Sequence, residues 1–95
     1  MKRIYVVIDF DSRIDEYQKR VLISDYYTVG MLMFKIRQKW LLDLHETEAM
    51  FLMFNDASKH GYILQPVTKT LAEIQRDFGN PAVINISVRL ENAFG

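Results

Sequence analysis

Apolar residues near the start of the chain predict two strands. Residues 3–8 (RIYVVI) are β-branched and apolar on both faces, and residues 19–24 (KRVLIS) form a second run after a polar stretch. Both runs have the length and composition that are typical of strands.

A helical pattern begins after the turn DYYTVG. Apolar residues recur at i, i+3, i+4, i+7 and i+11, which places them on one side of a helix; they are Val29, Leu32, Met33, Ile36 and Trp40. The hydroxyl of Thr28 stands where it can accept a hydrogen bond from a free amide of the first turn. We therefore expect a helix that begins at Val29 and ends near Trp40 or Leu41.

Residues 49–54 (AMFLMF) are the next apolar run and predict a third strand. The pair Asn55-Asp56 is typical of turns, so we expect it to close this strand. A shorter extended segment, Gly61–Leu64, follows before Pro66.

A second helix and a long strand are expected in the last third of the chain. Thr70 and Glu73 form the T-x-x-E pattern of a capping box, and Gly79 is placed to end that helix in the left-handed conformation. Residues 82–88 then alternate between two faces, as in a half-buried strand; the apolar face holds Ala82, Ile84, Ile86 and Val88.

The order of these elements predicts an α+β fold of the β-grasp, or ubiquitin-like, type. It implies a mixed sheet of four to five strands packed on one main helix, with a shorter second helix. Because crossover connections are right-handed, the last strand can pair in parallel with the first at the centre of the sheet. A ferredoxin-like layout is the competing arrangement, but it requires a helix after the first strand. We expect the domain to occupy residues 1–90.

The composition is that of one globular domain without a strong charge. The 95 residues are 49% hydrophobic and 25% charged, and 12 basic residues balance 12 acidic ones. A zero net charge argues against nucleic-acid binding, which needs a basic excess on one face. The sequence has no cysteine and no apolar run long enough for a signal peptide or a membrane span. We therefore expect a cytoplasmic protein that acts as a monomer.

Patterns of catalytic or metal-binding residues are not apparent. His45 and His60 lie in polar stretches without partners at metal-ligand spacing. The stretch from Asp9 begins like a calcium loop, but Ile14 stands where glycine is required and Arg20 stands where a bidentate acid is required. No nucleophile pairs with a general base at a suggestive spacing. We therefore expect neither an enzyme nor a bound metal or cofactor.

The second predicted strand has features of a peptide-binding edge. The free backbone amides and carbonyls of an edge strand can pair with an incoming peptide. Lys19 and Arg20 can attract an acidic peptide, although charges at this place also deter edge-to-edge aggregation. On the first strand, Tyr5 and Val7 point outward if their neighbours face the core, which leaves an apolar pair beside the edge. Four methionines are expected to fill the core; they are Met31, Met33, Met50 and Met53.

The last five residues, ENAFG, fit no secondary-structure pattern. Chain ends are often frayed. An aromatic residue followed by glycine also suits a reactive carboxylate, since glycine leaves the carbonyl sterically open. We expect residues 91–95 to form a flexible conjugation tail with a reach of about 16 Å when extended.

Five ordered pieces of the chain resemble the autophagy ubiquitin-like modifiers, the family of GABARAP and autophagy-related protein 8. The pieces are RIYVV, KRVLIS, TVG followed by Ile36-Arg37, MFLMFND and ENAFG, and together they cover residues 3–95. The two helices that precede the first strand in the family have no counterpart in this sequence.

The resemblance implies a conjugation reaction at the glycine. In the family, an activating enzyme adenylates the terminal carboxylate, which passes as a thioester through conjugating enzymes to the amine of phosphatidylethanolamine. Gly95 would be the acyl donor and Phe94 a recognition residue. The lipid would then anchor the protein to the autophagosome membrane.

The resemblance also implies a groove for W-x-x-L-type motifs of receptors and adaptors, which add a strand to the second strand of the family fold. One apolar pocket would be lined by Tyr5, Val7, Arg20, Leu22 and Val83. A second would be lined by Val21, Ile23, Tyr27, Leu32 and Lys35. Arg20, beside Lys19, would meet acidic residues of the motif.

Two alternatives stay open. The absence of the two helices also fits autophagy-related protein 12, a sibling modifier that ends in an aromatic-glycine pair and is joined to a lysine of a protein partner. A β-grasp adaptor that binds peptides and is never conjugated is the third interpretation. The motifs TVG and ENAFG favour the lipid-conjugated branch.

Overall fold

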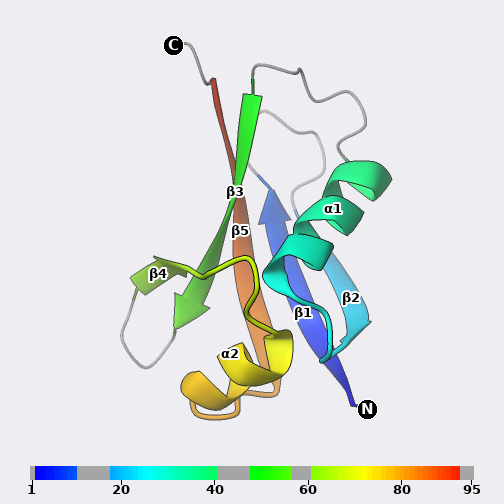
Figure 1. Ribbon diagram of the computed structural model, residues 1–95, viewed down its shortest axis with the longest axis vertical. Coiled ribbons are helices and arrows are strands. Elements are labelled where there is room, and N and C mark those ends of the chain that lie inside the picture. The colour runs from blue at the N-terminus through cyan, green and yellow to red at the C-terminus, as the bar shows by residue number, and fades with distance from the viewer. Residues whose placement is uncertain (1, 11–17, 41–47, 57–60, 93–95) are drawn as a thin grey trace.

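The chain folds as a mixed five-stranded sheet with two helices packed against it (Figure 1). The computed structural model describes residues 2–10, 18–40, 48–56 and 61–92. The strands in these ranges are β1 (Arg3–Phe10), β2 (Gln18–Ser24), β3 (Glu48–Asp56), β4 (Gly61–Leu64) and β5 (Val83–Asn92). The helices are α1 (Val29–Trp40) and α2 (Leu71–Asp77).

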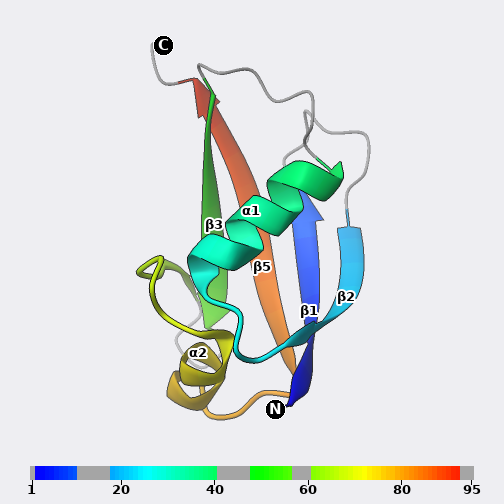
Figure 2. The same ribbon diagram turned by 45° about the vertical axis from the view of Figure 1, so that its right-hand side comes forward.

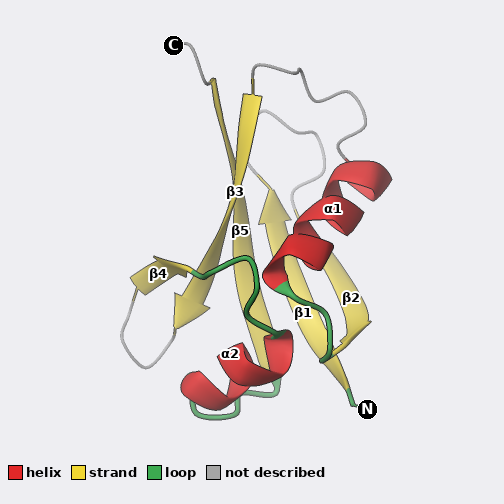
Figure 3. Cartoon of the chain, in the orientation of Figure 1, coloured by secondary structure: helices red, strands yellow, loops and turns green. Residues whose placement is uncertain are grey.

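The strand order across the sheet is β2-β1-β5-β3-β4 (Figure 3). The central pair, β1 and β5, is parallel, with Val6 opposite Ile84, whereas every other pair is antiparallel. The parallel pairing of first and last strands and the neighbouring β1 and β2 are the predicted β-grasp arrangement. The competing ferredoxin-like layout is wrong, because it separates the first strand from the second.

One face of the sheet is buried beneath the helices, as the alternation of apolar residues predicts. Figure 2 shows α1 lying diagonally across this face and α2 near its lower end. The buried core draws on every described strand except β4 and on both helices; its members include Ile4, Val6, Ile8, Leu52, Phe54, Ile84, Ile86, Leu32, Ile36, Leu71 and Ile74. The opposite face is uncovered by either helix, and we call it the open face.

The second helix is capped as predicted. The Glu73 amide donates to Thr70 Oγ1 at 3.2 Å, and the Thr70 amide donates to Glu73 Oε1 at 3.1 Å, which completes a capping box. Because the Thr70 amide and hydroxyl both donate to its carboxylate, the pKa of Glu73 lies below its ordinary value. The helix ends at Asp77, and after the C-cap residue Phe78 the chain turns at Gly79, whose φ of 84° is in the left-handed region that glycine adopts without strain.

Backbone hydrogen bonds tie the starts of the two helices together. The Leu71 amide donates to the Tyr27 carbonyl at 2.8 Å, and the Val29 amide donates to the Lys69 carbonyl at 2.9 Å. A single antiparallel bridge between Thr28 and Thr70 lies between these bonds. The short helix α2 is therefore held both by its buried side chains and by the segment that leads into α1.

The motif TVG has a structural role at this junction. Thr28 Oγ1 accepts a hydrogen bond from the Met31 amide at 3.1 Å, and Val29 is buried. The Gly30 amide donates to the Val67 carbonyl at 2.9 Å, and a Cβ at Gly30 would lie 3.3 Å from that oxygen. Glycine thus permits the close approach of the segment that precedes α2.

The expected turn at Asn55-Asp56 is wrong. Both residues belong to β3, where Asn55 pairs with Tyr62 and Asp56 pairs with Gly61 of β4. Asp56 is also buried. The local preference of Asn and Asp for turns is overridden here, because β4 supplies partners for the backbone.

The expected start of the C-terminal tail at residue 91 is also wrong. Strand β5 continues to Asn92, since Glu91 pairs with Ala49 and Asn92 pairs with Glu48 at the start of β3. Residues 93–95 lie outside the described residues. An extended segment of three residues reaches about 10 Å, rather than the about 16 Å expected for five.

Candidate functional site

The second strand is an edge of the sheet, as its sequence predicts. In the described part of the chain β2 pairs with β1 alone, through seven residue pairs from Arg3 opposite Ser24 to Asp9 opposite Gln18. Its other side presents backbone groups that a further strand can use. The described edge at the opposite end of the sheet, β4, has only four residues.

Side chains of β2 alternate between the two faces of the sheet. Val21 and Ile23 pack toward the core beneath α1, whereas Arg20 and Leu22 are exposed on the open face. The two pockets that the family resemblance implies therefore fall on opposite faces of the edge strand.

The residues of the implied second pocket line two hollows beside β2 and α1 that share Leu22, Ile23 and Lys35, and we call the two together the β2–α1 groove. Its upper part, of about 200 Å³, is lined by Val21, Leu22, Ile23, Leu32, Lys35, Ile36, Lys39 and Trp40. Its lower part, of about 280 Å³, is lined by Arg3, Leu22, Ile23, Ser24, Tyr27 and Lys35. All five predicted residues lie here, together with Lys39 and Trp40, which the sequence analysis did not propose.

Two lysine side chains, Lys35 and Lys39, line the β2–α1 groove. Lys35 Nζ donates to the Tyr27 hydroxyl at 3.3 Å and lies 5.3 Å from the centre of that ring. Lys39 Nζ lies 5.2 Å from the centre of the Trp40 ring. Neither β2 nor α1 contains an acidic residue. The groove therefore combines apolar side chains with cationic ones, and its lower part is the more polar of the two.

The residues of the implied first pocket are neighbours on the open face. Tyr5 lies opposite both Leu22 of β2 and Val83 of β5, and Val7 lies opposite Arg20. The Arg20 guanidinium carbon is 4.8 Å from the centre of the Tyr5 ring, within cation–π distance. This strip, with Tyr5 and Leu22 exposed, offers an aromatic and an aliphatic contact surface beside a fixed positive charge.

The arrangement suits an extended peptide paired to the free side of β2. Successive side chains of such a peptide point to opposite faces of the enlarged sheet, so residues separated by three positions also point to opposite faces. A W-x-x-L-type spacing would place one apolar side chain over the open-face strip and the other in the β2–α1 groove.

Several predicted residues lie elsewhere. Lys19 is half-buried opposite Ile8, on the helix side of β2. Gly95 and Phe94 lie outside the described residues, as do both histidines and most of the calcium-like stretch.

The expectation that the four methionines fill the core holds for two of them. Met50 is buried and Met33 packs against the core, but Met31 is exposed on α1 and Met53 lines a hollow on the open face. The helical stripe indicates this outcome for Met31, since that residue lies off the stripe. Phe34 also lies off the stripe, but the sequence analysis did not propose it as an exposed residue.

Two features of the described residues concern metal binding and membrane insertion, namely the clustering of metal-ligating side chains and the length and apolar character of the helices. Over residues 2–10, 18–40, 48–56 and 61–92, no three or more acidic, histidine or cysteine side chains gather as a metal site would require. Among these same residues, neither helix has the length and apolar character needed to span a bilayer.

Comparison with known proteins identifies the fold. No protein-family model and no curated protein sequence matches the chain. The solution NMR structure of the ubiquitin-like domain of an Arabidopsis thaliana protein matches it with a TM-score of 0.60 and 22% sequence identity, over 95% of this chain and 79% of that one. The chain therefore has a ubiquitin-like fold.

Proposed function

We propose that the chain is a ubiquitin-like interaction module that binds an extended W-x-x-L-type peptide along β2. The observation that carries this proposal is the edge position of β2, with the β2–α1 groove on one face and the Tyr5–Leu22 strip on the other. Main-chain pairing would supply affinity, and the two flanking apolar surfaces would supply specificity.

The charge around this edge selects an acidic partner. Arg20, Lys35 and Lys39 flank the two surfaces, and no acidic side chain on β2 or α1 offsets them. Pairing of β2 with β2 of a second copy would bring these cations together, and like charges across an interface are unfavourable. Carboxylates on a peptide would face the same cations favourably.

Charge reversal at the edge tests this binding mode. We expect Arg20→Glu and Lys35→Glu each to weaken the binding of an acidic W-x-x-L peptide by about three- to tenfold, because each replaces an attraction with a repulsion at a solvent-exposed pair. Isothermal titration calorimetry with one synthetic peptide measures the dissociation constants. The matched control is Arg89→Glu, which changes the net charge equally on the open face of β5. Equal affinity in all four proteins would contradict the assignment.

We further propose, as the finer function, that Gly95 is conjugated to phosphatidylethanolamine after transfer through activating and conjugating enzymes. The supporting observations are the ubiquitin-like fold and the sequence motifs shared with the autophagy modifiers. The lipid would bring the module to the autophagosome, where the β2 edge would recruit receptor or adaptor peptides. The chemistry requires a free carboxylate on Gly95 in the cell.

Intact-mass analysis of the membrane and soluble pools separates the candidates. We expect a mass increase equal to one phosphatidylethanolamine less one water in the membrane pool, and its loss in Gly95→Ala. An isopeptide-linked protein adduct would instead favour the protein-conjugated sibling. If neither adduct forms when the matching enzymes are present, conjugation is wrong, and peptide binding at β2 would make the chain an unconjugated adaptor.

A further inference from the structure

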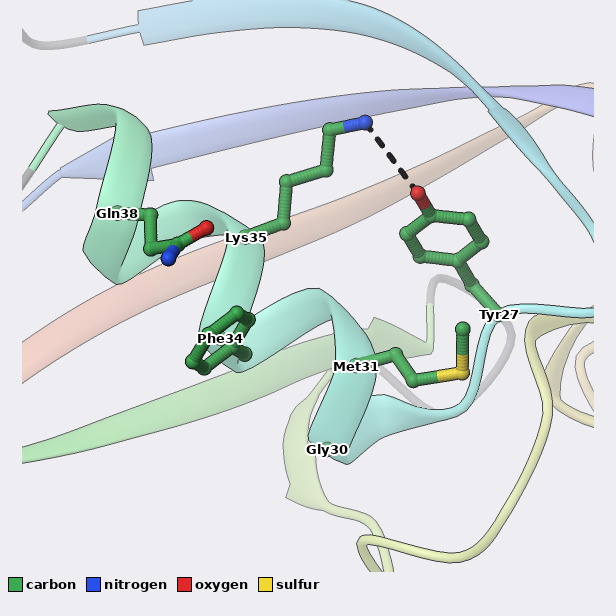
Figure 4. Close-up of a pocket in the computed structure, with 6 residues that line it drawn as sticks. All are labelled: Tyr27, Gly30, Met31, Phe34, Lys35 and Gln38. Atoms are coloured by element: carbon green, nitrogen blue, oxygen red, sulfur yellow. Dashed lines mark hydrogen bonds between the residues drawn. The ribbon is translucent and has the colours of Figure 1, made fainter.

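The outer side of α1 carries a second hollow that the peptide-binding edge does not use. It has a volume of about 510 Å³ and is lined by Tyr27, Gly30, Met31, Phe34, Lys35 and Gln38 (Figure 4). We call it the outer α1 hollow. Figure 4 shows Met31 and Phe34 on the outer side of the helix, with the sheet behind it.

The two large apolar side chains here are unusually exposed for their type. Phe34 is 64% exposed and Met31 is 51% exposed, although neither belongs to the stripe by which α1 packs on the sheet. Val67, which is beside Gly30, is exposed as well. Exposed apolar residues that cluster are typical of interaction sites, so Met31, Phe34 and Val67 together indicate a binding surface.

The hollow has positive charge on two sides. Lys35 is one of its walls, and Arg37 follows Phe34 by three residues, so it lies beside Phe34 on the helix surface. No acidic residue occurs in α1. An occupant with carboxylates beside its apolar side chains would complement this surface.

The backbone around the hollow restricts the form of the occupant. The hollow lies against a helix, and the amides and carbonyls of a helix interior are already bonded within the helix. An extended peptide would find no backbone partners there, so the occupant must satisfy its own backbone. A helix does this and can place a side chain into a hollow between ridges of another helix.

We propose that the outer α1 hollow is a docking site for an acidic amphipathic helix of a partner protein. Its apolar stripe would pack between Met31 and Phe34, and its carboxylates would meet Lys35 and Arg37. A second copy of the chain fits poorly, because a two-fold contact of α1 with α1 would oppose like charges.

This site shares two residues, Tyr27 and Lys35, with the edge site. Both residues line the outer α1 hollow and the β2–α1 groove, whereas Phe34 and Arg37 do not line the groove. Substitutions at Phe34 and Arg37 therefore test the new site without disturbing the proposed peptide site.

A phage-displayed library of 16-residue peptides, of a length that makes about four helical turns, tests the proposal. It is selected on the intact chain and counter-selected on Phe34→Gln, which keeps a good helix former at an exposed position. We expect enriched peptides with apolar residues at i, i+3 or i+4, and i+7, and a negative net charge. Bound to ¹⁵N-labelled chain, they should shift the amide signals of Gly30, Met31, Phe34 and Gln38.

Affinity measurements on the enriched peptides give the decisive comparison. Phe34→Gln should weaken binding at least tenfold, and Arg37→Glu several-fold, while both variants keep the wild-type affinity for the W-x-x-L peptide. Arg37→Glu serves as the second variant should Phe34→Gln alter the fold. Peptides that are basic, or that bind both variants like wild type, would overturn the proposal. Shifts of these amide signals that depend on protein concentration in the absence of peptide would indicate self-association and would also overturn the proposal. The same holds if no peptide is enriched and the chain instead binds vesicles with 30% phosphatidylserine in a manner that depends on Phe34.

Discussion

Replacing Phe54 with alanine is expected to bring the whole domain close to unfolding. Phe54 is fully buried, lies on β3 between Ile86 of β5 and Ile63 of β4, and belongs to the hydrophobic core. Its truncation removes apolar contact and leaves a cavity, at a cost of about 3–5 kcal/mol. Domains of this size are stable by only about 5–15 kcal/mol, so the loss is a large fraction of the total. Urea denaturation followed by circular dichroism measures it.

The same substitution at Phe34 is the matched control for Phe54→Ala. Phe34 is exposed on α1, and alanine is the better helix former, so Phe34→Ala should change the free energy of unfolding by less than about 1 kcal/mol. A loss of similar size in both variants would contradict the assignment of Phe34 to the outer surface. It would also remove the main support for the docking site on α1.

Leu71→Ala is expected to have the second largest effect and to act first on α2. Leu71 and Ile74 are the only buried apolar anchors of this seven-residue helix. Truncating one of them costs about 2–5 kcal/mol. Because the Leu71 amide is bonded to the Tyr27 carbonyl and the Ala72 amide to the Asp25 carbonyl, the start of α1 should loosen with α2.

Hydrogen exchange distinguishes this local effect from a general loss of stability. In Leu71→Ala we expect the amides of α2 and of Val29 to lose protection by about 100-fold or more, which corresponds to about 2.7 kcal/mol, while β1 and β5 change less. A uniform loss across the sheet would show instead that α2 opens only with the whole domain. Leu64→Ala, at a position that is 56% exposed on β4, is the control and should have little effect.

Lys35 connects the two proposed sites physically. Its amino group is bonded to the Tyr27 hydroxyl, and the pair forms the ridge between the outer α1 hollow and the β2–α1 groove. A carboxylate bound in the outer α1 hollow or in the β2–α1 groove would attract the same Lys35 amino group. Both proposals therefore place α1 at the centre of recognition, as a wall that the two sites share.

Periodicity along the chain was sufficient to predict the elements and the core. The helical stripe from Val29 to Trp40 and the alternation in β5 both report which side is buried, since burial of apolar surface is the main force that orders these elements. The capping box at Thr70 and the left-handed Gly79 follow from local chemistry, so they too were predicted correctly.

Element ends depended on partners that are distant in the sequence. Asn55 and Asp56 have turn-forming character, yet β4 pairs with them and extends β3. Glu91 and Asn92 match no local strand pattern, yet the first residues of β3 complete their ladder. Local propensity is a weak signal compared with backbone pairing, which is why both predictions failed.

The candidate sites likewise have some features that the sequence predicts and others that only the tertiary structure shows. The sequence by itself determined that residues 19–24 form a strand with cationic residues at its start and that Tyr5 points outward, because these properties follow from residue type and alternation. Only the tertiary structure decided that the implied pockets lie on opposite faces of β2 and that Lys39 and Trp40 join one of them. The exposure of Phe34 and Met31 was decided there too, because a surface is defined by which segments fail to cover it, and that depends on contacts between residues far apart in the chain.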